Sequence, residues 1–336
     1  MKVAQGTFTG NGTTQEIVIS SGSGSFAPDF VIVKTASTDV SVMKISSMAT
    51  DLTKAMNNVG SALFANGITL TATGFSVGTD VRVNRASSAV YYLAVKGDNQ
   101  GAVGSYVGND TTRNIVTGFS PDLAIVGPDS VSYAAQWGCT EFEELNDGTV
   151  EGGSFASTHL NGRMPLPWNA SSFIVTGDDS VNVTGTTYHY AAFRIVTGLF
   201  EEFSYTGNDA DGRAIDQLTF QPDFVMVQRI SGSSSTACLR FAAQGAGDTT
   251  VTVSGAFQGA NRIQAIRPLG FEVGTDNGIN NNGDIYVGFA FKAGSVTGGG
   301  KPGRPPRPPG GGPPGGGGGT FTSPVLKKMR FPEKVI

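Results

Sequence analysis

The 336-residue chain has few of the residues on which most catalytic and metal sites depend. It holds two cysteines, Cys139 and Cys238, and two histidines, His159 and His189. No Cys-x-x-Cys or Cys/His cluster occurs, which excludes a disulfide framework and the usual zinc spacings. Nothing in the sequence marks a serine or cysteine partner for His159, and His189 is expected on a strand face. We therefore expect a protein that is not an enzyme and that carries no cofactor and no metal.

Charge and long apolar runs are also scarce. Only 15% of the residues are charged and the formal net charge is −4. Residues 301–336 carry seven Lys/Arg and one acid, a formal +6, so residues 1–300 carry −10. An acidic body cannot neutralise phosphates, which argues against nucleic-acid binding. No run approaches membrane-spanning length, and "MKVAQGTFTG" lacks the apolar stretch of a signal peptide, so we expect synthesis in a cytosol and no membrane insertion.

What the chain has in abundance is glycine and a threefold internal repetition. It contains 48 Gly, which is typical of short strands joined by tight turns. "GTFTGNGTTQEIVI", "GSYVGNDTTRNIV" and "FSYTGNDADGRAI" correspond, as do "FAPDFVIV", "FSPDLAIV" and "FQPDFVMV". Phe75, Phe173 and Phe271 are 98 residues apart, and Lys96, Arg194 and Lys292 keep the same spacing. Several anchors with one period establish a repeat.

A period of 98 residues is the size of a complete β-sandwich rather than of a solenoid unit or propeller blade. Blocks such as "GFSVGTDVRV" and "IYVGFAFK" alternate as half-buried antiparallel strands do. We predict an all-β fold of three tandem antiparallel β-sandwich modules of jelly-roll or concanavalin-like type. The predicted boundaries are 1–98, 99–197 and 198–296, called here the first, second and third repeat.

The end of the chain has a different composition. Residues 298–319 contain 12 Gly and 7 Pro without a strict Gly-x-y period, so we predict a linker over 297–319. It would span roughly 26 Å as a coil and about 68 Å as polyproline II. Residues 320–336 regain apolar side chains and are predicted to dock on a partner. The predicted docking residues are Phe321, Val325, Leu326, Met329, Phe331, Val335 and Ile336.

The recurring acids have a structural and a functional interpretation. Proline fixes φ and an aspartate after it can bond backbone amides two residues on, so Pro28-Asp29, Pro121-Asp122 and Pro222-Asp223 predict strand-entry turns. Asp80, Asp178 and Asp276, each four residues before an asparagine, are expected at hairpin tips. Calcium is a second reading of such acids, and only Asp276–Asp284 is rich enough in oxygen to test, although it lacks the spacing of an EF-hand loop.

Aromatic side chains single out the middle of the second repeat, where the three copies diverge. Trp137 and Trp168 are the only tryptophans, with Tyr133 and His159 nearby. Exposed aromatics stack on sugar faces, so these four residues are the candidate ligand surface, and the open alternative is that the aromatic side chains cap the core of the second sandwich.

The pairing of Gly-x-[Phe/Tyr]-x-Gly-Asn with a downstream Pro-Asp-apolar strand resembles repeats in structural proteins of tailed bacteriophages. The resemblance covers residues 6–34, 104–126 and 203–228 and the later strand blocks, and the first copy departs from it by inserting "SSGSGS". It implies a concanavalin-type sandwich in a virion component, and it supplies no catalytic residues.

Two classes of function follow. The first is a non-enzymatic virion protein, displayed outside, attached to other virion proteins by its C-terminal peptide and binding a host-surface glycan or protein as a tail adhesin or fibre. Capsid decoration or a head fibre is its alternative, and the three repeats could form a pseudo-threefold cap on a trimeric partner or a homo-oligomer. The second class is a carbohydrate-binding accessory or a glycan-active enzyme.

Overall fold

The computed structural model describes residues 1–22, 24–57, 63–129, 133–141, 153–155, 164, 168–231, 235–248, 250–255, 257–258 and 260–295. The chain divides into two compact units, Met1–Lys301 and Pro302–Ile336. The predicted docking peptide, the linker and His159 lie outside the described residues.

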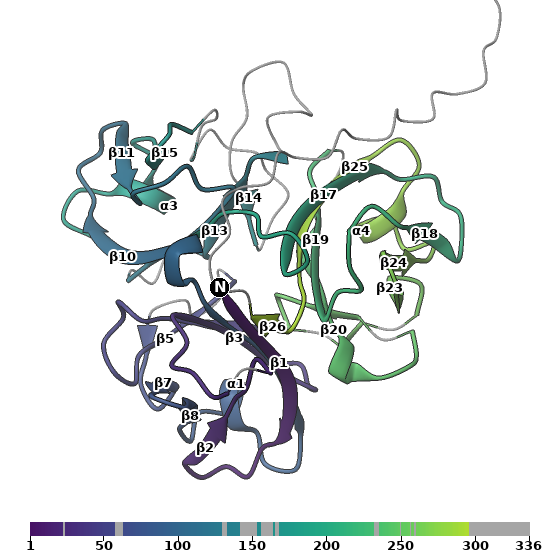
Figure 1. Cartoon of the computed structure of the whole chain (residues 1–336), viewed down its shortest axis with the longest axis horizontal. Helices are drawn as coiled ribbons and strands as arrows, with labels where there is room; N and C mark the ends of the chain where they lie inside the picture. The colour runs from purple at the N-terminus through teal and green to yellow at the C-terminus, as the bar shows by residue number, and fades with distance from the viewer. Residues whose placement is uncertain are drawn as a thin grey trace, which may run out of the picture. The chain divides into compact units, whose positions relative to one another are not determined.

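The first repeat pairs a large and a small antiparallel sheet (Figure 1). The large sheet has the order β26-β1-β9-β3-β4-β5-β6 and the small sheet the order β2-β8-β7. One short helix, α1 (Val81–Asn84), follows β8. The strands are β1 (Lys2–Thr9), β2 (Gln15–Val18), β3 (Phe30–Thr35), β4 (Val42–Ile45), β5 (Thr53–Ala55), β6 (Leu63–Phe64), β7 (Ile68–Thr71), β8 (Gly74–Val77) and β9 (Ala89–Lys96).

The second repeat keeps the same strand order in shorter form. Its sheets run β10-β16-β12-β13-β14 and β11-β15, and a 3-10 turn, η1 (Asp98–Gln100), leads into it. The strands and helix are β10 (Gly101–Val107), β11 (Arg113–Val116), β12 (Leu123–Pro128), β13 (Gln136–Cys139), β14 (Gly153–Ser154), β15 (Ser172–Val175), α3 (Asp179–Asn182) and β16 (Thr187–Phe193).

The third repeat has the order β17-β25-β19-β20-β21-β22 in its large sheet and β18-β24-β23 in its small sheet. Its last strand, β26 (Gly294–Ser295), pairs with β1 of the first repeat, Lys2 opposite Ser295. The other elements are β17 (Phe200–Thr206), β18 (Arg213–Ile215), β19 (Phe224–Arg229), β20 (Cys238–Phe241), η2 (Ala242–Gln244), β21 (Thr250–Thr252), β22 (Phe257–Gln258), β23 (Ile263–Arg267), β24 (Gly270–Val273), α4 (Asn277–Asn280) and β25 (Ile285–Phe291).

The all-β prediction is confirmed, and the sequence period corresponds to a recurring sheet topology. No helix among these described residues is long and apolar enough to cross a bilayer.

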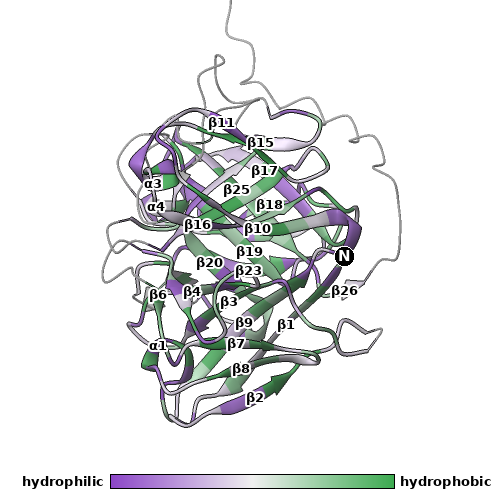
Figure 2. Cartoon of the chain, turned by 90° about the vertical axis from the view of Figure 1, so that its left-hand side faces the viewer, coloured by the Kyte–Doolittle hydropathy of each residue, from purple (hydrophilic) through white to green (hydrophobic). Residues whose placement is uncertain are grey.

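The central strands of each large sheet are buried on both faces, and among them the closing strands β16 and β25 differ from the prediction of half-buried strands. One face packs on the small sheet of its own repeat, giving three separate clusters. The opposite faces pack together into a single cluster, called here the common core. Hydrophobic stretches run along these strands (green in Figure 2). The common core includes Phe30, Ile32, Met43, Ile45, Leu93, Val95, Leu123, Ile125, Trp137, Cys139, Ala191, Phe193, Phe224, Met226, Leu239, Phe241, Val287, Phe289 and Phe291.

Aromatic rings connect the repeats through this common core. Phe193 of the second repeat lies 6.0 Å from Phe30 of the first and 6.1 Å from Phe291 of the third, between ring centroids. Tyr91 of the first repeat stacks on Phe241 of the third at 5.9 Å. Because each repeat would expose an apolar sheet face alone, the three share one interior. Whether each can fold as a separate domain stays a prediction.

A large and a small residue exchange places between repeats at one point of the sheets. Gly6 lies opposite Tyr92 and Gly104 opposite Tyr190, whereas in the third repeat Phe203 lies opposite Gly288. A Cβ on Gly6 would come within 2.5 Å of the Tyr92 hydroxyl. Each repeat therefore pairs one large aromatic side chain with a glycine at this point, but in the third repeat the aromatic residue lies on the opposite strand of the pair.

Candidate functional site

The structure places Trp137, the centre of the predicted ligand surface, in the common core. Its side chain is fully buried, 5.8 Å from the ring of Phe289 and 6.0 Å from that of Phe155. Its indole Nε1 donates a hydrogen bond to Gln228 Oε1 of the third repeat at 2.6 Å. The prediction that Trp137 is exposed for ligand stacking is therefore wrong, because β13 turns this face of the sheet towards the neighbouring repeat.

Trp168 lies on the other side of the same sheet. It is 8% exposed and packs on Phe173 at 5.9 Å, within the separate core of the second repeat. Tyr133 is partly exposed and donates to Asp179 Oδ2 at 3.1 Å. The two tryptophans thus belong to different cores, and the structure does not bring them together into one surface. The alternative that these side chains cap the core of the second sandwich fits Trp168, whereas Trp137 belongs to the common core.

The aspartates of the three Pro-Asp pairs have one shared structural role. Each carboxylate accepts the backbone N–H of the residue at which the chain leaves its closing strand, 68 to 73 positions away, and not an amide two residues on as predicted. The distances are 2.7–2.9 Å. The pairs are Asp29 with Gly97, Asp122 with Ile195 and Asp223 with Ala293. These aspartates therefore anchor the exits from the repeats.

The second set of recurring acids caps helices and does not form hairpin tips. Asp80, Asp178 and Asp276 are the N-caps of α1, α3 and α4, and each carboxylate accepts a backbone N–H of the first helical turn. The asparagines four residues later are fully buried. Asn84, for example, accepts from the backbone N–H of Asn11 at 2.9 Å and donates to Gly78 O at 2.9 Å. A satisfied buried amide explains why this pair recurs.

The glycine before each repeated asparagine is required by a close approach of two chain segments. A Cβ built on Gly10, Gly108 or Gly207 would overlap the backbone carbonyl of Arg85, Val183 or Asn281. The Gly-Asn signal is thus a packing requirement.

The two aspartate carboxylates of the candidate calcium loop, Asp276–Asp284, form ion pairs with arginines. Asp276 Oδ2 pairs with Arg262 Nε at 3.2 Å, and Asp284 pairs with Arg229, whose side chain is 9% exposed. Across the described ranges, no group of three or more His, Cys, Asp or Glu side chains is arranged to hold a metal ion. The oxygen-rich composition of this loop is accounted for by ion pairs.

His189 lies at the junction of the first and second repeats. Its Nδ1 is 2.8 Å from Ser47 Oγ of the first repeat, and its Nε2 is 3.0 Å from Asp129 Oδ1. Ser47 Oγ also donates to Gly104 O at 2.8 Å, so its proton has a competing acceptor. Burial lowers the pKa of His189, and Asp129 partly opposes this effect. The contacts resemble a serine–histidine–aspartate chain, but here they join two repeats.

Lys34 holds the junction of the first and third repeats. Its ammonium group donates to Ser37 O at 2.8 Å, to Asp39 O and to Gly255 O of the third repeat at 3.1 Å. Burial lowers the pKa of Lys34 to about 8. Close by, the backbone N–H of Ser41 donates to Val253 O at 2.9 Å. This junction is held by main-chain carbonyls.

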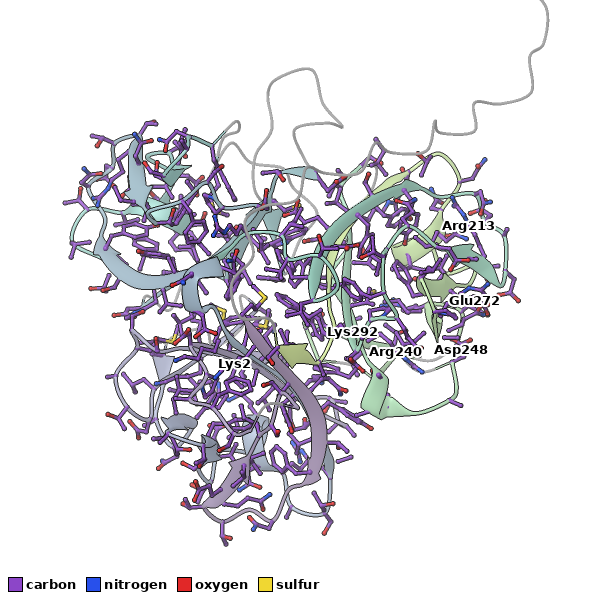
Figure 3. The ribbon with its side chains drawn as sticks, in the orientation of Figure 1. Lys2, Arg213, Arg240, Asp248, Glu272 and Lys292 are labelled. Atoms are coloured by element: carbon purple, nitrogen blue, oxygen red, sulfur yellow. The ribbon has the colours of Figure 1, made fainter. Side chains whose placement is uncertain are left out.

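Buried cations also organise the loops that follow β4 and β20. Lys44 donates to the carbonyls of residues 48, 49, 50 and 52, and burial lowers its pKa to about 8. Arg240, at the corresponding position of the third repeat, donates to Gly245 O and Gly247 O at 2.8 Å (Figure 3). Gly138 occupies this position in the second repeat.

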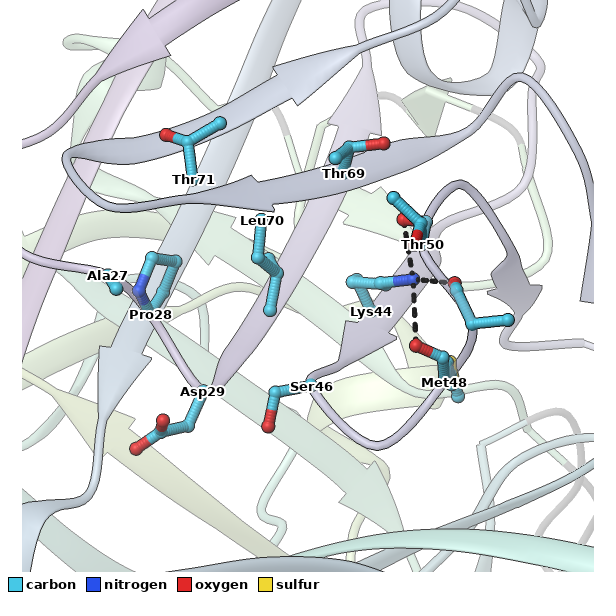
Figure 4. A pocket seen from close by; sticks show the side chains of 11 residues that line it. Ala27, Pro28, Asp29, Lys44, Ser46, Met48, Thr50, Thr69, Leu70 and Thr71 are labelled. Carbon is cyan, nitrogen blue, oxygen red and sulfur yellow. Dashed lines mark hydrogen bonds between the residues drawn. The ribbon is translucent and has the colours of Figure 1, made fainter.

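A cavity of about 460 Å³ lies beside Lys44 in the first repeat (Figure 4). Its lining is mixed, because residues that carry hydroxyl groups, together with Asp29, lie beside the apolar residues Pro28 and Leu70. Thr71 Oγ1 is buried there without a hydrogen-bond partner among the described residues. The lining residues are Ala27, Pro28, Asp29, Lys44, Ser46, Met48, Ala49, Thr50, Thr69, Leu70 and Thr71. Sequence reasoning missed this cavity, because its lining comes from three separate segments, residues 27–29, 44–50 and 69–71.

The fold and these contacts define an all-β protein in which paired antiparallel sheets are joined through a common core. A family model described as "Domain of unknown function (DUF7483)" matches residues 4–195, so the chain belongs to the DUF7483 family. The matched range spans the first two repeats. No curated protein matches the chain, and no solved structure matches it.

Proposed function

We propose that this protein is a non-enzymatic structural component of a bacteriophage particle, tethered by its C-terminal peptide and displayed on the surface as a host-binding tail adhesin or fibre. Its partners would be other virion proteins and a host-surface glycan or protein. Capsid decoration or a head fibre is the alternative within this class. The sequence resemblance supplies the phage assignment.

The observation that supports a structural role best is the use of the repeated polar residues. The recurring aspartates anchor strand exits or cap helices, and the recurring asparagines are buried and satisfied. A site that performs chemistry leaves polar groups directed at a substrate. Because the recurring polar residues hold the fold together in all three repeats, we favour a scaffold role.

The tether is tested by removing Thr320–Ile336 and measuring incorporation of the protein into particles. We expect incorporation to be lost, because the apolar side chains of this segment are its means of docking. A matched pair of variants separates apolar contact from charge: Leu326→Ser with Phe331→Ser should detach the protein, whereas Lys327→Gln with Lys328→Gln should not. Undiminished incorporation of the deletion variant would overturn the tether.

A second candidate function, carbohydrate binding, is favoured by the cavity beside Lys44. Its volume falls within the range of small-molecule sites, and the threonine and serine residues of its lining supply hydroxyl groups of the kind that hydrogen-bond a sugar. Leu70→Trp should fill the cavity and abolish glycan binding on an array. Leu269→Trp, at a residue 49% exposed in the third repeat, is the control. Binding that survives Leu70→Trp would place the ligand elsewhere.

A further inference from the structure

Glu202 is a buried acid at the junction of the second and third repeats. It lies on β17 and is only 9% exposed. Its Oε2 accepts a hydrogen bond from Thr140 Oγ1 of the second repeat at 2.9 Å. Its Oε1 is buried and has no hydrogen-bond partner within the described ranges. A carboxylate left half-satisfied in an interior is costly in its charged form.

The charges that act on Glu202 make ionisation still less favourable. They come from Asp122, before β12, and Glu141, after β13, which are 5% and 4% exposed. Both are acids. Burial raises the pKa of Glu202 well above its ordinary value of 4.5, and the two acids raise it further. The hydrogen bonds from Thr140 and from the Glu141 backbone oppose this rise without cancelling it.

The repeats show that the sheet itself does not need an acid here. Glu202 lies opposite Phe289, and the corresponding residues are Gln5, opposite Leu93, and Val103, opposite Ala191. Val103 packs against the common core. A neutral amide and an aliphatic side chain thus fill the same position in the other repeats, so the carboxyl is particular to this junction.

We propose that Glu202 is a proton-operated latch between the second and third repeats. With its proton, the side chain stays in the junction on Thr140. Without it, the side chain carries a negative charge in the interior beside the acids Asp122 and Glu141, and the junction loosens.

The direction of the effect follows from linkage. Because the pKa of Glu202 is higher in the folded than in the unfolded chain, the proton stabilises the fold fully below the unfolded value of 4.5. That stabilisation is lost as the pH rises through the folded value. Between the two values, Glu202 alone raises the unfolding constant about tenfold per pH unit.

The experiment compares the full-length protein with Glu202→Gln, which copies the residue of the first repeat and keeps an acceptor for Thr140. Unfolding constants are measured by urea titration from pH 5 to pH 7 and above. Glu201→Gln is the matched control. Glu201 is the next residue on the same strand, is more exposed than Glu202, and its carboxylate accepts a hydrogen bond from the backbone N–H of Thr219.

We expect the ratio of unfolding constants, wild type over Glu202→Gln, to rise with pH from pH 5, by up to about tenfold per pH unit until the folded pKa is passed, while the ratio for Glu201→Gln changes little. Infrared spectroscopy of the wild type at pH 5 should show a protonated carboxyl that Glu202→Gln lacks. Parallel stability curves for wild type and Glu202→Gln would overturn the proposal. If Glu202→Gln fails to fold, absence of the protonated carboxyl band in the wild type would overturn it as well.

Discussion

Replacing Trp137 with alanine distinguishes a core residue from a ligand-binding one. The side chain is fully buried between Phe155 and Phe289, and a Trp→Ala change in such a site costs about 3–5 kcal/mol. Gln228 Oε1 would also lose the indole N–H that it accepts at 2.6 Å, which costs about 1–3 kcal/mol for a buried group. The loss is a large part of the roughly 5–15 kcal/mol that stabilises a typical protein.

The two contributions separate in a milder series. Trp137→Phe keeps most of the ring volume but leaves Gln228 without its donor, so it should lose about 1–3 kcal/mol. Adding Gln228→Leu removes the Oε1 acceptor but also the Nε2 group that donates to Ser154 O, so the double variant should recover only part of that loss. Urea unfolding followed by far-ultraviolet circular dichroism gives the free energies. Tyr133→Phe, at a partly exposed side chain, should change stability by less than about 0.5 kcal/mol.

One result would refute the core assignment. If Trp137→Ala lost less than about 1 kcal/mol while abolishing binding to cells or glycans, the tryptophan would be a recognition residue and not part of the common core.

Three further predictions concern single points of the fold. Gly10→Ala should destabilise the protein by about 1–3 kcal/mol because its Cβ overlaps the Arg85 carbonyl, and denaturant midpoints will measure it. Burial lowers the pKa of His189, so the contribution of neutral His189 to stability is complete above the unfolded value of 6.5 and is lost as the pH falls below it. His189→Gln should therefore remove that part of the pH dependence of the unfolding free energy. An unchanged pH dependence would contradict the lowered pKa of His189. Gly6→Phe and Tyr92→Gly should each destabilise the first repeat, the first by steric overlap and the second by leaving a cavity that costs about 3–5 kcal/mol. The double variant should regain stability, because it copies the Phe–Gly pair of the third repeat. Losses that simply add in the double variant would count against this exchange.

Some of the candidate sites could be predicted from the sequence only in part. The recurrence of Asp122 and its counterparts indicated a structural role. The hydrogen-bond partner of Asp122, however, is a backbone amide 73 residues away, which local turn chemistry does not reveal. Glu202 carries no motif. Its one sequence signal is that the corresponding positions hold Gln5 and Val103, so an acid among neutral counterparts was the clue.

The sequence by itself determined the repetition and the fold class. Strand-forming residues, turn glycines and a 98-residue period are local or additive properties of the chain, so they can be counted without knowing what packs on what. The structure confirms the all-β fold that these properties predict, and the same strand order recurs wherever the sequence recurs.

Only the tertiary structure decided which face of each large sheet is interior. Trp137 illustrates the reason: an aromatic side chain on a strand is equally suited to a core and to a sugar-binding surface, and the choice depends on whether another sheet covers it. Here the sheets of the other repeats cover it, because three apolar faces leave water together in one common core. That cooperation links residues as far apart as Lys34 and Gly255, which no pattern within a single repeat can express.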